Sequence, residues 1–139
     1  FHVTGVQTCA LPIFAYCWAA IPGFSAFGSY TGNGSTDGPF VFCGFRPRWI
    51  MLKRTDASGE GWLMYDSVRG GFNPNNYDFF ANNSNAEDTS APGVNTNGLG
   101  DILSNGFKIR SYAGSNNTSG GTYIFAAFAD VPFKYARGR

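Results

Sequence analysis

The chain is nearly devoid of histidine: among its 139 residues the single one is His2. Hydrolases that use a serine or cysteine nucleophile need a nearby base, most often histidine. His2 lies in a segment that we predict to be an artefact outside the fold, so Ser-His and Cys-His catalysis are excluded. We expect no enzymatic nucleophile of this kind and no bound cofactor.

An excess of charge of one sign is also lacking. Ten basic and nine acidic residues give a net charge of +1. Nucleic-acid-binding domains carry clustered positive charge, so the sequence offers no electrostatic case for a nucleic-acid partner.

Cysteine is scarce as well, with three residues in all, Cys9, Cys17 and Cys43. Their spacing matches no zinc site, and Cys17 and Cys43 alone do not define a disulfide framework. We expect these two to be buried as small hydrophobic side chains.

The first residues, FHVTGVQTCALPIF, do not resemble a signal peptide or a membrane anchor. No Lys or Arg precedes the apolar part, Gln7 and Thr8 interrupt it, and Pro12 breaks it. The stretch from Val3 to Ile13 is instead what results from translating a DNA sequence that looks like a common short-read library adapter. This DNA sequence ends in one extra T, and both codons for Phe begin with T, as Phe14 requires. We therefore predict that residues 1–13 are an artefact outside the fold, the alternative being a genuine first strand that matches by chance.

The remaining sequence consists of short apolar stretches separated by turn-forming residues, with no long helical periodicity. This pattern is typical of an all-β, antiparallel β-sandwich. The predicted strands are Ala15–Ala19, Phe24–Tyr30, Phe40–Cys43, Trp49–Thr55, Gly61–Asp66, Phe107–Tyr112 and Thr122–Ala129. We expect the core to contain Trp49, Ile50, Leu52, Trp62, Met64, Phe107, Ile109, Tyr123 and Phe125.

The strand from Trp49 to Thr55 has apolar residues on both faces, which predicts a central position. The connection DASGEG, with Gly59 and Gly61, favours a hairpin. We therefore expect Trp49–Thr55 to pair antiparallel with Gly61–Asp66.

The domain organisation is indicated by a weak internal repeat: FAYCWAAIP at 14–22 is similar to IFAAFADVP at 124–132. We interpret residues 14–22 as a strand from the end of a preceding module, unless both stretches share only a common strand composition. Residues 23–139 then form the β-sandwich module of a larger protein.

Within the module, the segment from Gly70 to Gly100 is longer than joining two strands requires, and loops of that length tend to be functional. Amide and aromatic side chains concentrate in it, and such side chains bind sugar hydroxyls and sugar faces. The ligand-binding candidates are Asn73, Asn75, Asn76, Tyr77, Asn82 and Asn83.

Two other patterns in the sequence bear on function. In NGSTDG, the residues Asn33, Ser35 and Asp37 match the first half of a calcium loop, but its twelfth position is Gly44, so a glycine-rich turn is favoured and no metal is predicted. Paired carboxylates that cleave a glycosidic bond remain an alternative, with Asp66, Asp78, Glu87, Asp88 and Asp101 as candidates.

Five stretches carry a resemblance to a known family: YTGNGSTDGPFVFCGFRPRWIMLKRTD, MYDSVRG, FANNSNAED, ILSNGFKIR and NNTSGGTYIFAAFADVPFK. In these the chain resembles uncharacterised modules near the C-termini of tailed-bacteriophage tail and fibre proteins, which are similar to concanavalin-type lectin sandwiches. The resemblance implies a concanavalin-like jelly roll located in the virion. It also implies contact with a host-surface glycan or receptor and with other tail proteins, and assembly as a homotrimer in fibres. It implies no membrane insertion and supplies no catalytic residues.

Three classes of function remain open on this basis. The first is a glycan- or receptor-binding module, the second is a structural spacer of the tail, and the third is a glycan-degrading enzyme. We predict the first.

Overall fold

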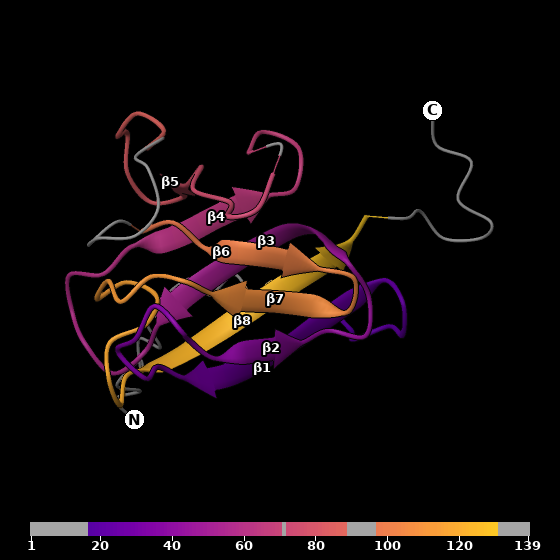
Figure 1. Ribbon diagram of the computed structural model, residues 1–139, viewed down its shortest axis with the longest axis horizontal. Coiled ribbons are helices and arrows are strands. Elements are labelled where there is room, and N and C mark those ends of the chain that lie inside the picture. Colours follow the sequence, from indigo (N-terminus) through magenta and orange to yellow (C-terminus); the bar gives the residue numbers. More distant parts are fainter. Residues whose placement is uncertain (1–16, 71, 89–96, 131–139) are drawn as a thin grey trace, which may run out of the picture.

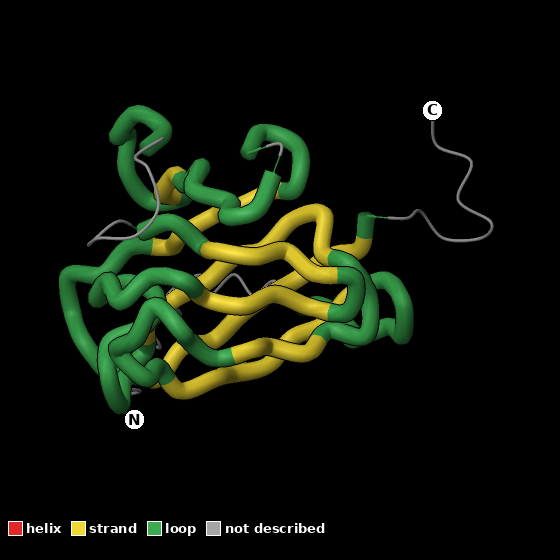
Figure 2. Tube along the Cα trace, in the orientation of Figure 1, coloured by secondary structure: helices red, strands yellow, loops and turns green. Residues whose placement is uncertain are grey.

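The computed structural model describes residues 17–70, 72–88 and 97–130, and within these ranges the chain forms strands and loops without a helix (Figure 2). Eight strands follow one another along the chain. They are β1 (Ser25–Thr31), β2 (Phe40–Phe42), β3 (Pro47–Arg54), β4 (Trp62–Asp66), β5 (Phe79–Phe80), β6 (Gly100–Leu103), β7 (Gly106–Ile109) and β8 (Thr122–Ala129).

The strands form two antiparallel sheets, one of five strands in the order β1-β8-β3-β4-β5 and one of three in the order β2-β7-β6. The smaller sheet lies across one face of the larger (Figure 1). In the larger sheet, β3 pairs with both β4 and β8, so it is the central strand. The predicted central position of this strand and its antiparallel pairing with β4 are confirmed.

The core lies between the two sheets. Alternate side chains of a strand point to opposite faces, and Ile50 and Leu52 of β3 point inward with no exposed surface. Phe107 of β7 meets Phe125 of β8 edge to face, with ring centroids 5.6 Å apart. Since buried residues of both sheets form one cluster, the predicted all-β antiparallel β-sandwich is confirmed.

Two strands were not predicted from the sequence, β5 and β6. β6 (GDIL) is short and begins with Gly and Asp, which are uncommon in strands. It forms because it pairs with β7 across a tight connection, with Leu103 opposite Gly106. Of the expected strand Ala15–Ala19, residues 17–19 are described, and they lie outside any strand.

The predicted core needs a correction at three positions. Trp49 and Met64 are half-buried and Trp62 is 37% exposed, because all three lie on the outer face of the five-stranded sheet. The three-stranded sheet covers only the inner face. Apolar residues on both faces of a strand therefore predicted its central position but not which face the second sheet would cover.

The cysteines also differ from expectation. Cys17 is exposed, because it precedes β1 and lies outside the sandwich. Cys43 is half-buried at the end of β2, and burial raises the pKa of its thiol to about 11. The Cys43 thiol is therefore protonated at neutral pH.

Candidate binding site

The loop that follows β4 is attached to the free edge of the smaller sheet. The Asn73 side chain donates a hydrogen bond to the carbonyl of Ile102 in β6 (3.0 Å) and accepts one from its N–H (2.9 Å). The backbone of Asn75 exchanges two hydrogen bonds with Gly100, of 2.5 and 3.1 Å. The described parts of the loops between β4 and β6 lie at this edge of the sandwich (Figure 1).

This attachment borders a half-open cavity of about 210 Å³, which we call the polar cavity because four of its six lining residues are polar. Its walls come from three parts of the chain: the residue before β3, the end of β4 with its following loop, and β6. The lining residues are Arg46, Ser67, Phe72, Asn73, Asn75 and Ile102. Phe72 is 89% exposed, so its ring is available to a bound molecule.

Asn75 is the most buried polar side chain of this cavity, with 3% of its surface exposed. Its Nδ2 donates a hydrogen bond of 2.6 Å to the Asp66 carbonyl, whereas its Oδ1 has no hydrogen-bond partner among the described residues. An unpaired buried acceptor costs about 1 to 3 kcal/mol, and this Oδ1 has almost no surface accessible to solvent, so a bound molecule does not reach it in this conformation. Asn75 therefore holds the loop in place, and the half-buried Ser67 brings a hydroxyl group to the lining of the cavity.

The six predicted binding residues do not form one surface. Asn73 and Asn75 meet in the cavity, although both also hold the loop in place. Asn82 is exposed, and its Oδ1 accepts a hydrogen bond of 2.8 Å from the Trp62 backbone. Asn83 is likewise exposed and accepts one of 3.0 Å from the Asn85 N–H, which closes a local turn.

The two remaining candidates, Asn76 and Tyr77, are half-buried and are not among the residues that line the cavity. Conversely, the sequence analysis missed Arg46, Ser67 and Phe72. Arg46 and Ser67 lie outside the segment from Gly70 to Gly100, and no motif connects them to it. Phe72 had a local signal, since an aromatic residue between turn-forming residues is seldom part of a strand.

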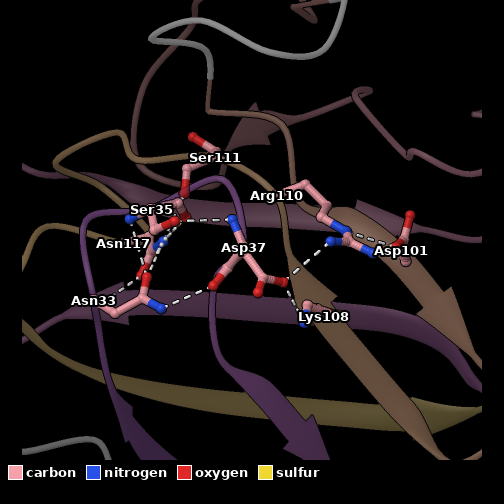
Figure 3. A network of polar contacts seen from close by, with 8 residues as sticks. All are labelled: Asn33, Ser35, Asp37, Asp101, Lys108, Arg110, Ser111 and Asn117. Atoms are coloured by element: carbon pink, nitrogen blue, oxygen red, sulfur yellow. Dashed lines mark hydrogen bonds and ion pairs between the residues drawn. The ribbon is translucent and has the colours of Figure 1, made fainter.

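The loop that resembles half of a calcium site is closed by its own hydrogen bonds (Figure 3). The Oδ1 of Asn33 accepts from the Ser35 N–H (3.0 Å) and from Nδ2 of Asn117 (3.1 Å), while Nδ2 of Asn33 donates to the Asp37 carbonyl (2.9 Å). The Asp37 carboxylate lies 2.6 Å from Nζ of Lys108. The hydrogen bond and charge of Lys108 lower the pKa of Asp37. These oxygens face protein donors, and within the described ranges no cluster of three or more His, Cys, Asp or Glu is placed to hold a metal ion.

The candidate catalytic carboxylates fall into two groups. Arg69 pairs with both Asp66 and Glu87, and its guanidinium lies 4.2 Å from the centroid of the Phe79 ring. Asp101 lies elsewhere and pairs with Arg110 at 2.8 Å.

Asp78 belongs with the first group and is 1% exposed. Its backbone exchanges two hydrogen bonds with Asp88, and neither of its carboxylate oxygens has a partner among the described residues. Burial, with the nearby charges of Asp88 and Glu87, raises the pKa of Asp78 to about 7. A carboxyl group this deeply buried has no path to a glycosidic oxygen in this conformation.

A second concave region lies on the outer face of the five-stranded sheet. The strand registers align Phe27, Met51 and Met64 in one row across the sheet and place Ile124 and Trp62 on either side of Lys53 in the next. Two adjoining hollows there measure about 330 and 440 Å³ and share Trp18, Met51 and Trp62. We call this region the apolar groove; the ring of Trp18 stacks against Phe27 in it at 6.3 Å.

No helix in the described portions of the chain is long and apolar enough to cross a membrane. Comparison with protein families shows that the chain belongs to the family described as a domain of unknown function (DUF7483), which matches residues 2–132. The match includes residues 2–13, for which the adapter origin stays a prediction, and no structure of that segment is described. No curated protein and no solved structure matches the chain.

Proposed function

We propose that this member of the DUF7483 family is a non-enzymatic module of a bacteriophage tail or tail fibre that binds a host-surface glycan or receptor. The resemblance stated above supports the virion location, the contacts with other tail proteins and the homotrimeric assembly. The polar cavity between β3, β4 and β6 supports the binding function.

One observation carries the binding function: Phe72, the most exposed large apolar side chain of the described residues, borders a cavity whose other lining residues are mostly polar. Sugars combine an apolar ring face with hydroxyl groups. An aromatic ring covers the first, and polar side chains form hydrogen bonds with the second. Pockets for drug-sized ligands measure about 300 to 1,000 Å³. The present cavity of about 210 Å³ therefore suits a single sugar ring, with the rest of a chain lying outside.

The test is replacement of Phe72, whose ring is almost fully exposed. Phe72→Ala should weaken binding to host cells or to a glycan panel at least about tenfold, equivalent to about 1.4 kcal/mol, because the ring contact is lost. Its melting temperature should stay close to that of the wild type. Phe42→Ala is the matched control, since Phe42 is also an exposed aromatic residue, at 67%, and lies in β2 outside the cavity lining. Equal binding by Phe72→Ala and wild type would refute the assignment to this cavity.

A second candidate function, a structural spacer of the tail, is favoured by the apolar groove. Exposed apolar surface on a sheet face favours association with another chain. Under this alternative, the wild type should associate in sedimentation experiments as concentration rises, and Trp62→Ser should reduce that association. A glycan-degrading activity is not proposed, because Asp66 and Glu87 both pair with Arg69 and Asp78 is buried.

A further inference from the structure

Nearly all the positive charge of the described residues is paired within the chain. Five of the seven basic residues there lie within 4.0 Å of a carboxylate: Arg48, Arg54, Arg69, Lys108 and Arg110. A sixth, Lys53, donates a hydrogen bond of 2.7 Å to the Arg54 carbonyl. All nine acidic side chains of the sequence also lie within the described ranges. Arg46 has no carboxylate partner among these nine.

Arg46 lines the polar cavity. No acidic side chain is among the other lining residues. Asp66 and Asp101 adjoin lining residues in the sequence, and Asp130 donates its backbone N–H to the Arg46 carbonyl. The carboxylate of each is paired with another base, Arg69, Arg110 and Arg48 respectively. The cavity therefore combines one unpaired guanidinium with uncharged polar groups, and its electrostatic field favours an anion.

We propose that the cavity selects a saccharide that carries a carboxylate, which Arg46 binds. This inference rests on the proposed glycan-binding function and specifies the class of sugar. The guanidinium group presents two parallel N–H donors that match the two oxygens of a carboxylate, and such paired hydrogen bonds are stronger than those between neutral groups.

The remaining groups of the cavity account for a sugar ring rather than a simple anion. The half-buried Ser67 brings to the cavity lining a hydroxyl group, which both donates and accepts hydrogen bonds and therefore binds a sugar hydroxyl. The exposed ring of Phe72 covers an apolar ring face. A ligand that satisfies all three residues has a carboxylate, a hydroxyl and a saturated ring, as in a hexuronic or nonulosonic acid.

The experiment measures the affinity of the full chain for matched oligosaccharides by calorimetry or NMR titration. One set ends in a hexuronic acid, its carboxyl methyl ester and the corresponding neutral hexose. A second set, with a nonulosonic acid and its ester, distinguishes the two natural sources of a sugar carboxylate. Inorganic phosphate serves as a competitor without a ring.

The wild type should bind at least one acid about tenfold or more tightly than its ester or neutral form, and millimolar phosphate should not displace it. Arg46→Gln should bring the acid to the affinity of the neutral sugar without changing the affinity of the latter. Arg46→Lys should retain part of the preference, because it keeps the charge and loses the paired geometry. Arg48→Gln is the matched control, since Arg48 is exposed, is two residues away and pairs with Asp130 rather than lining the cavity.

Equal affinity for acid and ester in the wild type, or an acid preference that survives in Arg46→Gln, would overturn this inference while leaving glycan binding intact. Absence of binding to every acidic and neutral sugar would overturn the proposed function and this inference together. Displacement of the acid by phosphate alone would reduce the site to a general anion site and would likewise overturn it.

Discussion

Replacement of the buried Asp78 by Asn should change how the stability of this protein depends on pH. The Asp78 carboxyl is 1% exposed, and its two oxygens have no partner among the described residues. Burial, with the charges of Asp88 and Glu87, raises its pKa from 3.8 to about 7. Arg69 opposes that rise, but its guanidinium already pairs with Asp66 and Glu87.

The sign of the effect follows from proton binding. Between pH 4 and pH 7 the folded state keeps a proton on Asp78 that the unfolded state releases, so folding becomes less favourable as pH rises. The stability that the protonated Asp78 contributes is fully present below pH 3.8, the pKa of this carboxyl in the unfolded state, and is lost as pH rises through about 7. One pKa unit corresponds to about 1.4 kcal/mol, so a rise of roughly three units gives at most about 4 kcal/mol, and solvent near Glu87 and Asp88 reduces it.

The assay is urea unfolding followed by tryptophan fluorescence from pH 4 to pH 8. Asp78→Asn should match the wild type at pH 4 and exceed its free energy of unfolding by about 2 to 4 kcal/mol at pH 8, because the amide stays neutral. Asp37→Asn is the control of opposite sign. The pKa of Asp37 is lowered by Lys108, so its loss should reduce stability at pH 7 and have no effect at low pH. Parallel curves for Asp78→Asn and the wild type would refute the reasoning.

Two further predictions concern stability. Asn117→Ala should lower the free energy of unfolding by about 3 to 5 kcal/mol, because Asn117 is fully buried and its Nδ2 donates hydrogen bonds to Oδ1 of Asn33 and to the Ser111 carbonyl. Asn83→Ala, at an exposed position, should cost less than about 1 kcal/mol. An equally small loss for Asn117→Ala would contradict the network of Figure 3. Phe107→Ala should cost about 3 to 5 kcal/mol and Trp62→Ala markedly less, since Phe107 is fully buried and Trp62 is 37% exposed. Thermal unfolding of both variants checks this order, and a larger loss for Trp62→Ala would mean that the outer face of the large sheet is covered.

The candidate site illustrates how far local sequence leads. The concentration of amide side chains after β4 predicted Asn73 and Asn75 as binding residues, and both line the cavity. The same composition also selected Asn82 and Asn83, whose oxygens accept backbone hydrogen bonds and hold turns. Composition alone does not separate an amide that is available to a ligand from one that stabilises its own loop, because both uses require the same chemical group.

The sequence by itself determined the class of fold. Alternation of Ile50 and Leu52 with outward residues defines a strand, Gly59 and Gly61 permit the hairpin that follows, and these features act over a few residues. Only the tertiary structure decided which face of the large sheet is covered, that Arg46 and Phe72 border one cavity, and that the Asp78 carboxylate is buried without a partner among the described residues. Each of these depends on segments far apart in the chain, since burial and charge pairing are set by the side chains that packing brings together rather than by neighbours in sequence.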